Sequence, residues 1–158
     1  MSERVDLRYL DASVAVAKRA RERGNHPFGA VLVGPDGTIL LEGENTVITE
    51  RDCTGHAELN IMREATKLYS PQFLWKCTMY ASTEPCAMCA ASIYWGNVGR
   101  VVFALSGERL YQLVKNPAKN PSLAIACRDV FSKGIKEIEV FGPIPAAGCE
   151  EIHEGFWD

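Results

Sequence analysis

Hydrophobic and polar residues alternate along the chain with two periods, one typical of helices and the other of strands. Leu7, Leu10 and Val14 follow one another at steps of three or four residues. This spacing predicts an amphipathic helix over residues 5–23, which ends at Gly24.

The next hydrophobic stretch has the pattern of a β-hairpin. Residues 28–33 and 38–42 are rich in strand-forming side chains, and they flank the sequence Gly34-Pro35-Asp36-Gly37. Glycine, proline and aspartate are the residues that tight turns require, so two adjacent strands are expected here.

The rest of the chain alternates between helical and strand patterns. It predicts, in order, a helix over 56–69, a strand over 77–82, a helix over 85–94 with Pro85 at its first position, a strand over 100–105, a short helix over 110–114, a helix over 122–133 capped by Ser122, a strand over 135–141 and a short C-terminal helix. Strand–helix–strand crossovers require parallel neighbouring strands with helices on both faces. The fold class is therefore α/β, with a three-layer α/β/α sandwich around a five-stranded mixed sheet.

The length and the charge restrict the class of protein. A chain of 158 residues has the length of one ordinary domain, so residues 1–158 are expected to form a single domain. Neither a secretory signal nor a membrane-spanning apolar stretch is recognisable, which indicates a cytoplasmic protein. The net charge of −3 is the opposite of what a nucleic-acid-binding surface needs, so a small-molecule partner is favoured.

Two short segments carry residues with metal-binding chemistry. The first is His56-Ala57-Glu58 and the second is Pro85-Cys86-Ala87-Met88-Cys89, and each lies where a helix is expected to begin. Cysteines three residues apart at a helix start point to one side, within reach of one tetrahedral zinc ion. With His56 as a third ligand, the fourth position would hold a water molecule, and one Zn²⁺ per chain is expected.

Glu58 is the expected catalytic base of such a site. It follows His56 by two residues and so lies beside the metal at the start of the same helix. From there it can take a proton from the activated water, deliver it to a ring nitrogen and then protonate departing ammonia. The combination of His-x-Glu with a later Pro-Cys-x-x-Cys is the signature of zinc deaminases that act on bases.

Other interpretations of the cysteines are weaker but stay open at this point. A lone Cys-x-x-Cys pair also fits a thioredoxin-like redox site, and the upstream His-x-Glu argues against that reading. Cys53, three residues before His56, could close a purely structural zinc site as a fourth ligand, although Glu58 would then have no role. The remaining cysteines are expected to be small apolar residues, namely Cys77, Cys127 and Cys149.

These motifs resemble those of the cytidine deaminase superfamily, over almost the whole chain and in the same order. Pro27-Phe28-Gly29-Ala30-Val31, Gly43-Glu44-Asn45 and the stretch from Glu84 to Trp95 look most like the branch of bacterial guanine and nucleoside deaminases. The resemblance implies a hydrolytic deaminase that forms a homodimer.

The resemblance also implies a set of substrate contacts. Asn45 would hydrogen-bond the substrate, the Ala57 backbone would contact the base, and Phe28 and Trp95 would form pocket walls. Each has a plainer explanation, since Asn45 can close a turn and the two aromatic residues can fill the core.

The C-terminus has an unusual composition for a chain end. Residues 149–158 include Phe156 and Trp157, two large rings that favour burial. In related deaminases C-terminal aromatic residues cover the pocket, so this segment is expected to act as a cap, with simple docking on the sheet as the alternative.

The expected substrate is a free nucleobase or nucleoside, with a guanine-type aminopurine ahead of cytosine. One departure weakens the guanine assignment, because the acidic residues that guanine deaminases carry after the fourth strand are represented here by Glu108 alone. The alternatives are a tRNA-specific adenosine deaminase, which the acidic charge disfavours, and a non-catalytic structural zinc protein.

Overall fold

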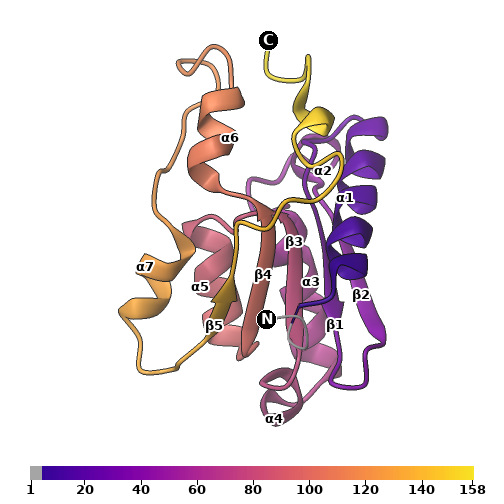
Figure 1. The fold of residues 1–158 in the computed structure, drawn as a ribbon, viewed down its shortest axis with the longest axis vertical. Coiled ribbons are helices and arrows are strands. Elements are labelled where there is room, and N and C mark those ends of the chain that lie inside the picture. Colours follow the sequence, from indigo (N-terminus) through magenta and orange to yellow (C-terminus); the bar gives the residue numbers. More distant parts are fainter. Residues whose placement is uncertain (1–4) are drawn as a thin grey trace.

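The computed structural model describes residues 5–158, which form helices packed on both faces of one sheet (Figure 1). The helices are α1 (Leu7–Glu22), α2 (Val47–Glu50), α3 (Ala57–Leu68), α4 (Pro71–Leu74), α5 (Ala87–Gly96), α6 (Gly107–Leu113) and α7 (Cys127–Ser132), followed by the 3-10 turn η1 (Glu151–His153). The strands are β1 (Gly29–Val33), β2 (Ile39–Glu44), β3 (Thr78–Thr83), β4 (Arg100–Leu105) and β5 (Glu139–Phe141).

The sheet is mixed and has five strands in the order β2-β1-β3-β4-β5. The β1–β2 hairpin is antiparallel, and β1 also pairs antiparallel with β3. From β3 onward the strands are parallel, because a helical crossover separates each strand from the next. The predicted five-stranded mixed sheet is confirmed.

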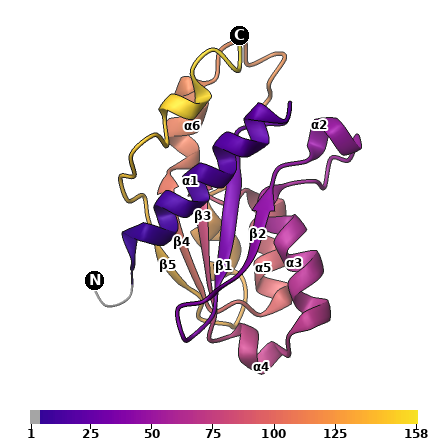
Figure 2. The same ribbon diagram turned by 90° about the vertical axis from the view of Figure 1, so that its right-hand side faces the viewer.

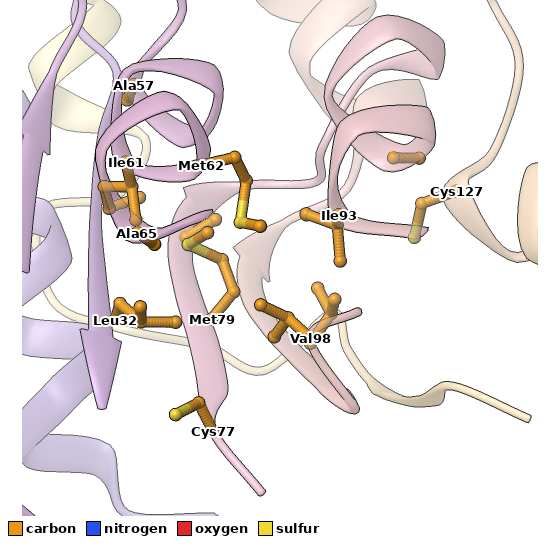
Figure 3. Close-up of a cluster of buried hydrophobic side chains, with 14 of the residues drawn as sticks. Leu32, Ala57, Ile61, Met62, Ala65, Cys77, Met79, Ile93, Val98 and Cys127 are labelled. Atoms are coloured by element: carbon orange, nitrogen blue, oxygen red, sulfur yellow. The ribbon is translucent and has the colours of Figure 1, made fainter. Parts of the chain in front are cut away.

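Helices cover the sheet on both faces, which confirms the three-layer arrangement (Figure 2). On one face α1 packs against β1 and β3, with Leu10, Val16 and Val102 among the buried side chains. On the other face α3, α5 and α7 enclose a second buried cluster that includes Met79 and Ile93 (Figure 3). Both faces of the central strands are therefore buried, as parallel sheets require.

Two glycines allow helices to lie unusually close to the sheet. A Cβ on Gly29 would lie 2.3 Å from the backbone nitrogen of Ala17 in α1, and a Cβ on Gly43 would lie 2.3 Å from the carbonyl oxygen of Ala57 in α3. Neither backbone could approach so closely if a side chain were present. The contact at Gly43 fixes the start of α3, which carries the His-x-Glu segment.

Two predicted elements are shorter than expected. The helix predicted over 122–133 begins only at Cys127, and Ser122 does not cap it. The carbonyl of Leu123 instead accepts hydrogen bonds from the Tyr111 hydroxyl and the Ile125 amide, which holds this stretch outside a helix. The strand predicted over 135–141 is reduced to residues 139–141, because β4 offers partners only from Arg100 to Val102.

Helix starts also differ from the prediction in position. Cys86 is the N-cap of α5, so Pro85 precedes the helix and does not occupy its first turn. Pro71 begins the short helix α4, which was not predicted, and the Ser70 hydroxyl accepts a hydrogen bond from the Phe73 amide at its start. The short helix α2 was not predicted, and α6 begins at Gly107 with Ser106 as its cap.

Candidate metal centre and active site

The predicted site residues meet at one end of the sheet, where β3 reaches its carboxyl end. The loop after β3 leads through Glu84 and Pro85 into α5, which begins at Cys86. On the neighbouring helix, His56 is the N-cap of α3, and α3 packs along α5. Two helix starts therefore face one another, and each brings part of the predicted metal site.

His56, Cys86 and Cys89 form a group whose ligand atoms all lie within 4.8 Å of one another. The Nδ1 atom of His56 lies 3.5 Å from the Cys86 sulfur and 3.4 Å from the Cys89 sulfur. Tetrahedral zinc, with Zn–S of about 2.3 Å and Zn–N of about 2.0–2.1 Å, would separate such a sulfur and nitrogen by about 3.5 Å. The donor set and its spacing thus fit a zinc ion.

The surroundings of Cys86 favour the thiolate that zinc binds. A hydrogen bond from the Cys89 thiol and the neighbouring His56 ring lower the pKa of Cys86 to about 4, although burial opposes the shift. Cys86 also precedes the first turn of α5, where the helix dipole favours negative charge. The thiolate in turn raises the pKa of His56 through their hydrogen bond.

Glu58 lies in the first turn of α3 and is buried, with 6% of its surface exposed. Burial raises the pKa of its carboxyl group, and the negative charge of Cys86 adds to this effect. A carboxyl group shielded from bulk water beside the metal ligands is suited to hold and release a proton.

Glu84 braces the loop that carries the cysteines. Its two carboxylate oxygens accept hydrogen bonds from the backbone amides of Gly107, at 3.0 Å, and Cys127, at 2.9 Å. These amides lie at the starts of α6 and α7, which have unpaired N–H groups in their first turns. The sequence contained this glutamate beside the Pro-Cys motif, but nothing local indicated that its partners lie in two later helices.

The other cysteines take no part in the metal group of residues 5–158. Cys53 is exposed on the loop before α3 and is not among the residues whose ligand atoms come together. The predicted apolar cysteines are buried, as expected, namely Cys77, Cys127 and Cys149. The site has three protein ligands, which leaves one tetrahedral position for water or substrate.

Asn45 and Phe28 lie beside the same end of the sheet. The backbone amide of Asn45 donates to the Phe28 carbonyl at 3.1 Å, and the backbone amide of Gly29 donates to the Ser82 hydroxyl at the end of β3. Asn45 is buried, and its Oδ1 accepts a hydrogen bond from Val47, so its side chain does close a turn. That bond uses the oxygen and leaves the NH₂ group as the part able to contact a substrate.

Ala57 and Trp95, the other two residues expected to contact the substrate from within the helices, lie in different surroundings. The Ala57 side chain is buried against the sheet, and its amide is the first of α3, where no intrahelical acceptor is available. Trp95 lies at the far end of α5 from the cysteines and is 79% exposed, so it does not fill the core. Its nearest ring is Tyr94, at 5.4 Å.

The C-terminal segment packs over the start of β1 through a group of rings that we call the aromatic cluster: His26, Phe28, His153, Phe156 and Trp157. Trp157 lies 6.0 Å from Phe28 and 5.4 Å from His26, measured between ring centroids. Both C-terminal aromatic residues are therefore packed against other rings of the chain.

Polar contacts tie the C-terminal segment to α6 and the loop after it, which lie at the same end of the molecule (Figure 1). Arg109 forms a bidentate ion pair with Glu150, and the Asn120 side chain donates to the Trp157 carbonyl.

The Glu108 side chain is exposed in the first turn of α6. His153, which the motifs did not single out, is the most buried residue of the aromatic cluster.

Comparison with known proteins identifies the family. Residues 3–105 match the family described as the cytidine and deoxycytidylate deaminase zinc-binding region. The chain belongs to this family. It is accordingly a zinc-dependent deaminase, a hydrolase, and His56, Cys86 and Cys89 form its zinc site.

Individual members of the family differ in substrate. The chain is 39% identical, over 97% of its length and 93% of the relative, to a probable cytosine deaminase of Schizosaccharomyces pombe. It is 46% identical to the guanine deaminase of Bacillus subtilis, over 61% of this chain and 62% of that protein.

Solved structures agree on the fold. The guanine deaminase of Bacillus subtilis matches with a TM-score of 0.61 and 38% identity, over 66% of this chain and 67% of that one. The guanine deaminase of Nitrosomonas europaea matches with a TM-score of 0.75 over 94% of this chain and 82% of that one, at 15% identity.

Among residues 5–158, no helix is long and apolar enough to cross a membrane.

Zinc, when bound, supplies a Lewis acid that lowers the pKa of water and makes it nucleophilic near neutral pH. The chain's own contribution is positional. The contact of Gly43 with α3 and the carboxylate of Glu84 hold the two helix starts that carry the ligands.

Proposed function

We propose that Glu58 is the catalytic proton carrier of a hydrolytic deaminase acting on a free nucleobase. The observation that carries the proposal is the placement of a buried carboxyl group beside His56, Cys86 and Cys89. Glu58 accepts a proton as water adds to the amine-bearing ring carbon and gives it to the ring nitrogen. It then takes the proton of the newly added hydroxyl group and gives it to the departing amine, so that ammonia leaves and a carbonyl group remains.

Five of the six substrate contacts implied by the resemblance fall into two groups, and the sixth, Trp95, lies away from both at the end of α5. Asn45, the Ala57 amide and Phe28 lie at the zinc-bearing end of the sheet, where Asn45 and the Ala57 amide offer hydrogen-bond donors and Phe28 an apolar wall. Phe156 and Trp157 pack with Phe28 and would form a cap over the ring. Such a cap suits a small flat base and obstructs a polynucleotide.

Within the free bases, we place a cytosine-type pyrimidine ahead of the guanine-type purine that the motifs favoured. The similarity to the probable cytosine deaminase extends over 97% of the chain, whereas the guanine deaminase matches 61% of it. The exposed position of Glu108 gives no support to a purine-binding role for that residue.

Editing of adenosine in tRNA is the second candidate, supported by a structural match. Deaminases studied for A-to-I editing at the wobble position of tRNA match with a TM-score of 0.64 and 25% identity over 85% of this chain and 95% of that one. The net charge of −3 argues against it, because binding tRNA requires contacts to several phosphates.

The test is ammonia release by the zinc-loaded protein from cytosine, guanine, adenine, their nucleosides and a tRNA substrate. Release from a free base that falls by about 10²- to 10⁴-fold in Glu58→Gln, with zinc content unchanged, is the expected result. Release from tRNA alone would favour editing. Zinc binding without ammonia release from any substrate would leave a non-catalytic zinc protein.

We also propose that the chain forms a homodimer, as its family resemblance implies. Trp95 and Ile135, which are 79% and 96% exposed, are large apolar side chains that such an interface would bury. Sedimentation equilibrium of the zinc-loaded protein tests the proposal, and a mass of one chain at all concentrations would contradict it.

A further inference from the structure

His153 is a buried residue with a defined tautomer. The residue is 3% exposed, and the indole Nε1 of Trp157 lies 3.1 Å from its Nδ1 atom. Because an indole nitrogen can only donate, Nδ1 must be the acceptor and must carry no proton. In a neutral imidazole the remaining proton then lies on Nε2.

The Nε2–H group has no acceptor among residues 5–158. It is a fully buried nitrogen without a hydrogen-bond partner. A buried donor that lacks an acceptor destabilises the fold, so such groups are uncommon and call for an explanation. The structure thus keeps a donor available without using it internally.

Two aromatic side chains lie next to the His153 ring. The His153 ring lies 5.5 Å from Phe28, and it is nearly coplanar with the Trp157 ring, at a centroid distance of 6.2 Å and an interplanar angle of 16°, because a hydrogen bond joins their edges. A buried water molecule would need two to four polar partners, and the rings of Phe28 and Trp157 offer none beyond the indole N–H that His153 already accepts. A flat ligand with an acceptor in its own plane matches the surroundings better.

The aromatic cluster borders the zinc site. The Phe28 carbonyl accepts a hydrogen bond from the backbone amide of Asn45, and His26 lies 5.7 Å from Phe156 in the same cluster. His153 therefore reaches the same end of the sheet as the metal ligands, although it comes from the last residues of the chain.

We propose that His153 is a specificity-determining residue whose Nε2–H donates a hydrogen bond to an oxo oxygen or ring nitrogen of the bound base. The inference rests on the proposed function, because it assumes a heterocycle with an in-plane acceptor. Trp157 then has two roles. It covers the ring of the bound base, and through its indole N–H it selects the His153 tautomer that presents the Nε2–H donor.

The first test observes the tautomer directly. Long-range ¹H–¹⁵N correlation of zinc-loaded Glu58→Ala protein, which cannot consume the base, distinguishes protonated from unprotonated ring nitrogens in a chain with three histidines. We expect His153 to carry its proton on Nε2 and the Nε2 resonance to shift when cytosine or guanine binds. An unprotonated Nε2, or a resonance that bound base leaves unchanged, would overturn the proposal.

The second test separates the two nitrogens. In His153→Asn the side-chain oxygen replaces Nδ1 as acceptor for Trp157, but no donor remains at the position of Nε2. In His153→Gln the amide nitrogen takes the place of Nε2–H. We expect KM to rise by about tenfold or more in the asparagine variant with kcat within a few-fold, and the glutamine variant to recover part of the loss. Equal losses in both variants that follow their stability would indicate a purely structural residue.

The outcomes keep the two proposals apart. If the parent protein releases ammonia from a base but His153 does not respond to that base, only the role of His153 is wrong. If zinc-loaded parent neither binds nor deaminates any base, the proposed function fails and the role of His153 fails with it.

Discussion

Cys53 and Cys89 illustrate how position in space separates residues that look alike in the sequence. Cys53 lies three residues before His56, and Cys89 lies three residues after Cys86. Spacing alone would allow either cysteine to be a zinc ligand. The fold buries Cys89 in the first turn of α5 facing His56, whereas Cys53 stays exposed on the loop before α3.

This difference predicts the metal content of two matched variants. Cys89→Ser removes a thiolate from the zinc group and is expected to lower the zinc content well below one per chain, because the remaining ligands are too few. Cys53→Ser should leave zinc content and activity unchanged. Metal analysis after dialysis measures both, and loss of zinc in Cys53→Ser would instead support a four-ligand structural site.

At the scale of elements, the close packing of α3 on β2 positions the His-x-Glu segment. Gly43→Ala would place a Cβ 2.3 Å from the Ala57 carbonyl and 2.7 Å from an Ile61 side-chain carbon, so the first turn of α3 must move. We expect a loss of about 1–3 kcal/mol in the free energy of unfolding, together with weaker zinc binding, because His56 caps that turn.

Gly107→Ala provides the matched control for this prediction. Its added Cβ would meet only ordinary van der Waals contact, with the Glu84 carboxylate at 3.7 Å, and alanine is the better helix former in α6. Urea denaturation and zinc titration of both variants measure the effects. A stable Gly43→Ala protein with normal zinc affinity would show that α3 can shift without disturbing the site.

At the scale of the whole molecule, the docking of the C-terminal segment makes stability depend on pH. Burial, and to a lesser extent the charge of Arg21 in α1, lower the pKa of His153 from its ordinary value of 6.5 to about 4, and Glu150 opposes the shift. The unfolded chain therefore takes up a proton at a higher pH than the folded chain. The stabilising contribution is complete above about pH 6.5 and is lost as the pH falls towards about 4.

Urea denaturation between pH 4 and pH 7 measures this effect as a difference between the parent and His153→Asn. Taking the difference removes the contributions of the zinc ligands and of His26, which also titrate. The parent is expected to lose more stability than the variant as the pH falls, by at most about 3 kcal/mol. Parallel curves would show that His153 is not buried in its neutral form.

Much of the fold and of the zinc site is encoded locally. Apolar spacing predicts α1, α3 and the central strands, because burial of one face forces a period on the side chains. The His-x-Glu and Cys-x-x-Cys segments predict the metal ligands for a similar reason, since a helix start fixes which neighbours share a side.

The extent of α7 and β5, by contrast, depends on partners that are distant in sequence. Residues 122–126 have a helical pattern, but α7 begins only where the Cys127 amide meets Glu84, and β5 is only as long as its pairing with β4. Local propensity cannot register a carboxylate or a strand edge contributed by another part of the chain.

The sequence by itself determined the family chemistry, because short segments at helix starts fix the types and spacing of the zinc ligands. Only the tertiary structure decided the surroundings of that chemistry. It exposed Trp95, braced the cysteine loop with Glu84, and brought His153 from the end of the chain to Phe28. Packing between distant segments, and not any local pattern, determines which side chains are buried together and which donors remain for a substrate.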